Sequence, residues 1–202
     1  VNSGGMLGMM EYGNGFDSTS GSLEDIFNGL YLSLDRCNVV IAYGGNFESS
    51  DAAQQEAINK IIGEAYALRA YVYLELAERW ENAVITELAE TVDDIKFTAD
   101  LSSQSELLEQ VVSDATNAIP LLKSRLENGD VGVPSKDMAY LLLAKAHMHL
   151  NNWAEAAAAA DGVIAQGAQL QPLDGIFGLE GGKTGEENNE ELIFSWIFNP
   201  AN

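Results

Sequence analysis

A single stretch, IIGEAYALRAYVYLELA at Ile61–Ala77, constrains the fold of this chain more than any other. Its aliphatic and small residues recur at intervals of three, four and seven, the spacing of one helix face: Ile61, Ile62, Ala65, Leu68, Val72 and Leu76. Tyr66, Tyr71 and Tyr73 extend the apolar surface beyond that face. A helix that is apolar on more than one side needs several neighbours, so the stretch predicts a central, buried helix. Arg69 lies in its middle and needs a polar partner if the guanidinium is buried.

Composition limits both the class of protein and its partners. The chain has 202 residues, of which 47% are hydrophobic, which is enough for a folded core. Acidic residues number 31 against 10 basic ones, and the net charge of −21 repels phosphate backbones, so nucleic acid is not expected as a partner. No apolar run is long enough to predict a membrane-spanning helix. The chain begins with Val1 and ends just after an apolar run, so we expect it to be part of a longer protein.

Helices are predicted on both sides of the central one from apolar periodicity, capping residues and turn signals. We expect them over residues 22–42, 51–80, 104–119, 135–150 and 153–165, with a short extended piece at 83–85. Residues 127–134 are predicted to be a loop, and the run ELIFSWIF at Glu191–Phe198 predicts one short strand. The prediction is thus one helical domain, 1–202, with an irregular segment at 1–21, a helical core at 22–167 and a loop with a short strand at 168–202.

One part of the chain matches the tetratricopeptide repeat (TPR), a unit of two closely packed antiparallel helices. The signature is found as Tyr140-x2-Leu143-Ala144-x2-His147, a turn at Asn151, Trp153, and Ala156-x3-Ala160, and a degenerate second unit starts at Tyr66 and ends at Ile119. Ala144 and Ala156 are small where the two helices cross, and Trp153 is expected to close the end of the pair. Because one helix hairpin cannot bury its apolar face alone, we predict an all-α fold: a TPR-like α-superhelix of antiparallel helix pairs with long irregular loops and a short β-prone C-terminal segment.

Residues that could bind a metal or carry catalysis are few. His147 and His149 are the only histidines, and two positions apart on a helix they point in different directions. Cys37 is the only cysteine and falls on an apolar helix face, so it is expected to be a core residue. We therefore predict no metal site and no cofactor, while the many carboxylates leave the acid and base pair of a glycosidase open.

Aromatic side chains outside the predicted helices are candidates for a different chemistry. A flat ring stacks against the apolar face of a pyranose, and two pairs of such rings are candidates here. Tyr12 and Phe16 flank Asn14 in the irregular N-terminal segment, and Tyr43 and Phe47 flank a Gly-Gly turn. The three tryptophans are instead predicted to be packing residues: Trp80, Trp153 and Trp196.

Four blocks of the sequence, in this order, resemble the SusD/RagB family of surface glycan-binding lipoproteins from Bacteroidetes-type bacteria. They are LYLSLDRCNVVI at Leu30–Ile41, IIGEAYALRAYVYLELAERW at Ile61–Trp80, the hairpin at Ala139–Ile164, and Phe177 with Glu191–Phe198. The second block is the most specific, because it fits the family pattern E-A-x-x-L-R-A-x-x-Y/F-x-x-L position by position. The chain departs from the family at Glu81–Val84, where a Gly-Asp-Val-Pro turn is usual, and family members are much longer.

The resemblance implies a function without catalysis. It implies a binding protein at the cell surface, held to the outer membrane by a lipid anchor that is not in this sequence. Such a protein captures an oligosaccharide or polysaccharide and delivers it to a SusC-like TonB-dependent transporter. Some ligand-contacting aromatics of the family precede the first helix, which makes Tyr12, Asn14 and Phe16 the predicted binding residues. Two alternatives stay open, a helical glycoside hydrolase with a carboxylate pair and a TPR-type adaptor that binds peptide.

Overall fold

A computed structural model describes residues 21–88, 99–170 and 191–196 of the chain. This part consists of six helices and one two-stranded ladder. The helices are α2 (Gly21–Gly44), α3 (Ala52–Arg79), α4 (Gln104–Ala118), α5 (Arg125–Asn128), α6 (Lys136–His149) and α7 (Trp153–Ala165). The strands are β1 (Asn82–Ala83) and β2 (Ser102–Ser103), which pair antiparallel. The predicted all-α class is confirmed. The predicted extended piece at 83–85 overlaps β1 at Ala83, whereas the pairing of β1 with β2 was not predicted.

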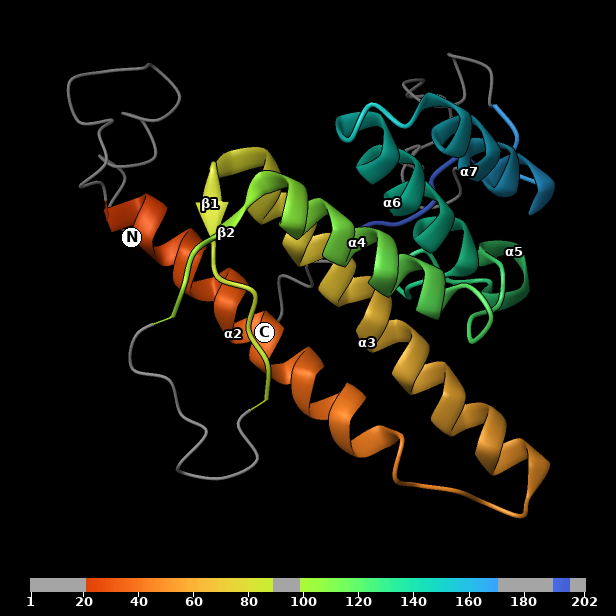
Figure 1. Cartoon of the computed structure of the whole chain (residues 1–202). Helices are drawn as coiled ribbons and strands as arrows, with labels where there is room; N and C mark the ends of the chain where they lie inside the picture. Colours follow the sequence, from red (N-terminus) through yellow and green to blue (C-terminus); the bar gives the residue numbers. More distant parts are fainter. Residues whose placement is uncertain (1–20, 89–98, 171–190, 197–202) are drawn as a thin grey trace, which may run out of the picture.

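The helices form stacked antiparallel pairs around α3 (Figure 1). α3 packs against α2 on one side and against α4 and α6 on the other, while α7 packs against α6. α3 with α4 and α6 with α7 are the two hairpins in which the TPR signature was found. The TPR-like arrangement is therefore confirmed, with α2 as an additional layer.

The central helix is buried around most of its circumference, as its sequence predicts. The buried positions lie on more than one side of the helix and leave the face of Tyr71 and Glu75 only partly buried: Gly63, Ala65, Ala67, Ala70, Val72, Tyr73, Leu74, Leu76 and Ala77. Leu34 of α2, Leu107 of α4 and Met138 of α6 lie in the same core. The first turns of α3 project beyond this core, and Ile61 is 54% exposed.

Side-chain caps fix where the helices begin. Asp51 accepts hydrogen bonds from the backbone amides of Ala53 and Gln54 at the start of α3, at 2.9 and 3.0 Å. Ser103 and Glu106 form the predicted capping box of α4. A second capping box, Ser124 with Glu127, begins α5, so the predicted loop at 127–134 is wrong at its first two residues. A four-residue helix contains too few positions to show an apolar period.

Three further predictions are corrected by the structure. Residues 191–196, the described part of the predicted strand, are not in a strand, although the amide of Ser195 donates to the carbonyl of Val131 at 2.9 Å. Trp153 does not close the α6–α7 pair, since it is 63% exposed. Trp196 is 54% exposed and is not a core residue.

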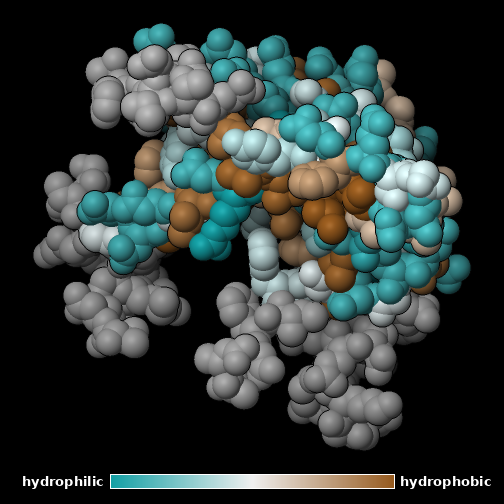
Figure 2. All heavy atoms as spheres, turned by 90° about the horizontal axis from the view of Figure 1, so that it is seen from below, coloured by the Kyte–Doolittle hydropathy of each residue, from teal (hydrophilic) through white to brown (hydrophobic). Residues whose placement is uncertain are grey.

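The described helices leave apolar side chains on the surface. Figure 2 shows hydrophobic residues gathered in a hollow on the face seen from below, with hydrophilic residues around them. The exposed large residues come from several elements and include Leu32, Val39 and Tyr43 of α2, and Met148, Trp153 and Ile164 of the α6–α7 pair. Within the described residues, no helix combines the length and hydrophobicity that a membrane span requires.

Candidate functional site

The predicted binding residues lie outside the part of the chain that the structure describes. Tyr12, Asn14 and Phe16 belong to residues 1–20, so their role remains a prediction. The second predicted pair of rings is described. Tyr43 lies in the last turn of α2 and Phe47 follows the helix, and the two side chains are 52% and 64% exposed, so both are accessible to a ligand.

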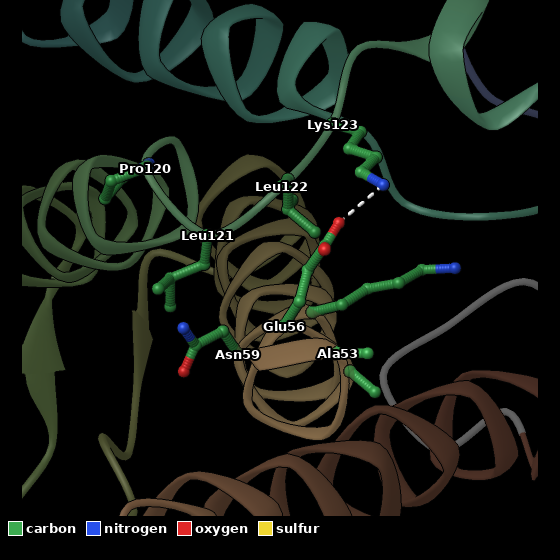
Figure 3. A pocket seen from close by; sticks show the side chains of 9 residues that line it. Ala53, Glu56, Asn59, Pro120, Leu121, Leu122 and Lys123 are labelled. Atoms are coloured by element: carbon green, nitrogen blue, oxygen red, sulfur yellow. Dashed lines mark ion pairs between the residues drawn. The ribbon is translucent and has the colours of Figure 1, made fainter. Parts of the chain in front are cut away.

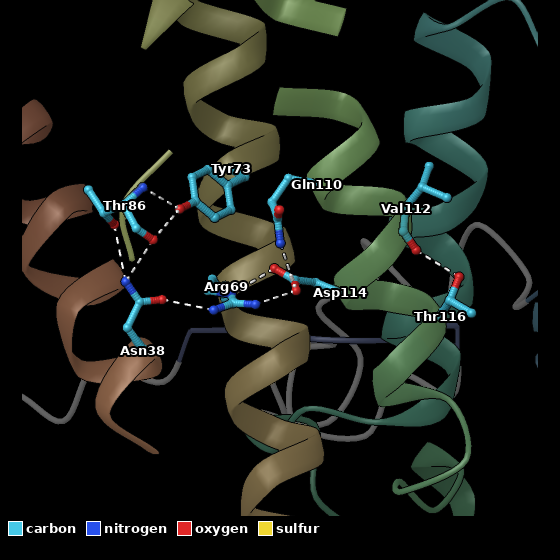
Figure 4. A network of polar contacts seen from close by, with 8 residues as sticks. All are labelled: Asn38, Arg69, Tyr73, Thr86, Gln110, Val112, Asp114 and Thr116. Atoms are coloured by element: carbon cyan, nitrogen blue, oxygen red, sulfur yellow. Dashed lines mark hydrogen bonds and ion pairs between the residues drawn. The ribbon is translucent and has the colours of Figure 1, made fainter. Parts of the chain in front are cut away.

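The most extensive polar arrangement is a network that joins three helices through Arg69 (Figure 4). From α3, Arg69 donates through Nε and Nη2 to the two carboxylate oxygens of Asp114 on α4, at 2.8 and 2.7 Å. Its Nη1 donates to Asn38 Oδ1 on α2 at 2.9 Å. The partner that the sequence required for Arg69 is thus supplied by two neighbouring helices.

This ion pair is shielded from water. The Asp114 side chain is fully buried and that of Arg69 is 16% exposed. Burial alone lowers the pKa of Arg69, but the hydrogen bonds and charge of Asp114 outweigh it, so that the pKa is raised. Gln110 donates to Asp114 Oδ1 at 3.1 Å, and the guanidinium lies 5.5 Å from the ring centre of Tyr66. The buried charge of each partner is therefore compensated.

The other end of the network holds the chain after β1 against α2 and α3. Asn38 Nδ2 donates to the carbonyl and the hydroxyl of Thr86, both at 3.1 Å. The Thr86 amide donates to the Tyr73 hydroxyl at 3.0 Å, and the Val84 amide donates to Tyr31 at 2.7 Å. These side-chain contacts fix residues 84–86, in the region where the chain departs from the family turn.

A hollow of about 280 Å³ lies beside the network and is lined in part by Asn38, Arg69, Tyr73 and Gln110. Typical small-molecule sites are about 300–1,000 Å³, so this hollow is small for a sugar chain. The polar groups of Asn38, Arg69 and Tyr73 already bond to one another and to Thr86. We therefore interpret the motif residues Arg69 and Tyr73 as scaffold residues that hold three helices and one connection together.

A larger hollow of about 400 Å³ lies between the first half of α3 and the chain after α4 (Figure 3). Glu56 and Lys123 face each other across it, 2.6 Å apart, and Asn59 and Lys60 also line it. The hydrogen bond to Lys123 lowers the pKa of Glu56, and the same bond raises the pKa of Lys123. Sequence reasoning did not identify this hollow, because Glu56 and Lys123 belong to segments that share no motif and are far apart in the sequence.

The histidines and the hydrogen-bonded carboxylates of the described residues have separate partners. Within the described ranges, no three His, Cys, Asp or Glu side chains gather as a metal site would require. His149 Nε2 lies 3.2 Å from Glu78, whereas His147 Nδ1 lies 3.4 Å from Asn152, so the two rings have different partners. Among the described residues, hydrogen bonds lower the carboxyl pKa values of Glu56, Glu106 and Glu127.

Comparison with known sequences gives one family. Residues 6–148 match the SusD-like family that is described as starch-binding and associating with the outer membrane. A SusD-like protein of Formosa agariphila is 28% identical over 132 residues, which are 65% of this chain and 24% of that protein. This chain therefore spans about a quarter of the length of its curated relative.

Solved structures of the same kind share the fold. A SusD superfamily protein of Bacteroides vulgatus superposes with a TM-score of 0.71 at 21% identity, over 89% of this chain and 37% of that one. A SusD-like carbohydrate-binding protein of Bacteroides fragilis gives 0.65 at 23% identity, over 76% and 29%. A laminarin-binding SusD-like protein gives 0.59 at 21% identity, over 70% and 31%. At these identities the structures establish a common fold.

Proposed function

This chain belongs to the SusD-like family, and on that premise we propose that it binds an oligosaccharide or polysaccharide at the cell surface without cleaving it. The observation that carries the proposal is the match of residues 6–148 to a family described as starch-binding and associating with the outer membrane. A laminarin-binding protein with the same fold supports carbohydrate as the ligand class. Starch and laminarin are both polymers of glucose, so these two polysaccharides are the first to test.

The geometry supports binding through a rigid scaffold. The Arg69–Asp114 pair and the Asn38–Thr86 contacts fix three helices and residues 84–86 relative to one another. Asp114 is held by Arg69, and Asp137, the other buried carboxylate among the described residues, accepts from the amide of Arg125 at 2.8 Å. Because these acids are already bound to donors, they are poorly suited to act as the acid and base of a hydrolase.

The partner and the place of action are part of the same proposal. The family description associates these proteins with the outer membrane. We infer that the protein is held there by a lipid anchor and delivers its glycan to a SusC-like TonB-dependent transporter. Co-purification of such a transporter with the membrane-bound protein tests this step, and a transporter that never accompanies it contradicts the step.

Native gels cast with polysaccharide test the function. We expect laminarin or starch to retard the folded chain relative to a non-binding protein, with no reducing sugar released during prolonged incubation. Release of reducing sugar contradicts the binding-only proposal and supports the helical glycosidase. Absence of retardation by every polysaccharide, together with capture of a peptide ligand, supports the TPR-type adaptor.

The predicted binding residues have a matched control within the chain. Tyr12 with Phe16 and Tyr43 with Phe47 are both Tyr-x3-Phe pairs. We expect the variant Tyr12→Ala/Phe16→Ala to lose retardation in the gel, because each lost ring contact weakens binding by about 0.5–1.5 kcal/mol. We expect Tyr43→Ala/Phe47→Ala to be retarded like the unmodified chain. The opposite pattern assigns the ligand to the end of α2 and contradicts the predicted site.

A further inference from the structure

Trp196 is held in place by two other aromatic rings. Its ring centre lies 5.8 Å from that of Tyr71 on α3 and 5.2 Å from that of Phe194. The planes meet at 62° and 82°, the edge-to-face geometry that aromatic pairs favour. Tyr71 and Phe194 in turn pack against the main core. More than half of the Trp196 surface nevertheless remains exposed, at 54%.

Charged side chains continue this surface along α3. Tyr71, Glu75 and Arg79 are spaced four residues apart, which places them on one face of the helix. Glu75 forms an ion pair with Arg79, and the two side chains are 18% and 47% exposed. Burial raises the pKa of the Tyr71 hydroxyl, and the charges of Glu75 and Arg79 also act on it. Trp196 therefore contacts the tyrosine that begins a row with a carboxylate and a guanidinium on one face of α3.

An exposed tryptophan needs no functional explanation by itself, because isolated apolar side chains are common on protein surfaces. Trp153 illustrates this case, since it is 63% exposed at the start of α7 and contacts no other aromatic ring among the described residues. Trp196 differs in two ways. Two aromatic rings hold it in place, and one of them, Tyr71, shares a helix face with the polar residues Glu75 and Arg79. A ring fixed in advance loses little conformational freedom when a ligand stacks on it.

We propose that Trp196, Tyr71, Glu75 and Arg79 form a carbohydrate-binding subsite on the surface of α3. The Trp196 ring stacks against the apolar face of a pyranose, and the ring hydroxyls bond to the Glu75 carboxylate and the Arg79 guanidinium. The ligand is a neutral hexopyranose unit of an oligosaccharide. This inference rests on the proposed carbohydrate-binding function, and it adds a site separate from the predicted residues at 12–16.

Affinity gels with laminarin and with starch test the subsite, using Trp196→Ala and the matched control Trp153→Ala. We expect Trp196→Ala to raise the Kd for the retarding polysaccharide about tenfold, equivalent to ~1.4 kcal/mol, and Trp153→Ala to leave it unchanged. Equal affinity of Trp196→Ala and the unmodified chain overturns the subsite and leaves the proposed function intact. Absence of binding by the unmodified chain overturns both.

A spectroscopic measurement covers the case in which Trp196→Ala lowers stability. In the Trp153→Phe variant, the remaining tryptophans are Trp80, which packs against the core, and the exposed Trp196. We expect saturating laminarin or starch oligosaccharide to shift the emission of this variant to shorter wavelength, because stacking removes Trp196 from water. An emission spectrum that does not change while the oligosaccharide binds overturns the subsite.

Discussion

At the scale of single residues, the structure assigns the motif residue Arg69 a partner in each of two neighbouring helices, α2 and α4. Asp114 lies 45 residues away in the sequence and is fully buried, so its charge depends on Arg69 for compensation. Asn38 takes the third guanidinium bond. The arginine of the motif that carries the family resemblance is thus explained by its bonds to two other helices, which stabilise the scaffold.

We predict that Asp114→Ala lowers the free energy of unfolding by about 3–5 kcal/mol, because it leaves the Arg69 charge without its partner in a mostly buried place. Urea unfolding followed by circular dichroism measures the change. Glu64→Ala is the control, since Glu64 forms an exposed i,i+4 pair with Lys60, worth at most about 0.5 kcal/mol. A similar small loss for both variants would show that the buried pair is not a principal support of the helix contacts.

The buried thiol of Cys37 permits a prediction about its reactivity and about how the stability of the fold depends on pH. Burial raises the pKa of its thiol from 9.0 to about 11, and the side chain is 7% exposed. Since the thiolate is the reactive form, we expect iodoacetamide at pH 8 to modify the native chain at least about 100-fold more slowly than the urea-unfolded chain. The raised pKa also means that this thiol stabilises the fold fully below about pH 9 and loses that contribution as pH rises through about 11. Equal alkylation rates in the two states would contradict the buried position.

Sequence reasoning predicted which environment these residues require, but it did not identify the residues that supply it. It required a polar partner for Arg69 and a core position for Cys37, and the structure confirms both. It could not identify Asp114, because α3 and α4 are joined by a long connection, and the sequence does not determine which residues of the two helices then lie opposite each other. It placed Trp196 in the core because hydrophobicity alone does not distinguish the packed Phe194 from the exposed end of the same run.

At the scale of helices, the α6–α7 hairpin depends on a close approach at Gly162. A β-carbon at this position would lie 2.5 Å from the Tyr140 ring, which is far inside normal contact. Ala144 and Ala156, the small residues of the repeat signature, are both buried at 7% exposure. The hairpin therefore depends on small buried residues and on the close approach of Gly162 to the Tyr140 ring.

We predict that Gly162→Ala lowers the free energy of unfolding by about 1–3 kcal/mol, because overpacking outweighs the better helix propensity of alanine. Gly29→Ala on α2 is the matched control, since a β-carbon there meets no atom within 4 Å. It should raise stability by about 0.5–1 kcal/mol. Thermal unfolding of both variants measures the difference, and a stabilising Gly162→Ala would contradict the close approach.

The helices themselves were largely predictable, because apolar period and caps act within a few residues. The caps at Asp51, Ser103 and Ser135 gave the starts of α3, α4 and α6. The failures occurred where structure depends on contacts distant in sequence. β1 and β2 pair across the acidic connection, and the run at 191–196 packs against the core without a strand partner.

At the scale of the whole molecule, the described helices form the scaffold of a family whose members are longer. This chain spans 24% of its curated relative and 37% of the Bacteroides vulgatus structure. The organisation of residues 1–202 as one helical domain, and the binding role of Tyr12, Asn14 and Phe16, remain predictions. Both depend on residues outside the described ranges.

The central claim is that the chain binds a glycan and leaves it intact. The most direct measurement is isothermal titration with a defined oligosaccharide of the polysaccharide that retards the chain, followed by chromatography of the recovered sugar. We predict a saturable binding curve and an oligosaccharide of unchanged length. A titration without saturation, or recovered sugar that is shorter than the sugar supplied, would contradict the account.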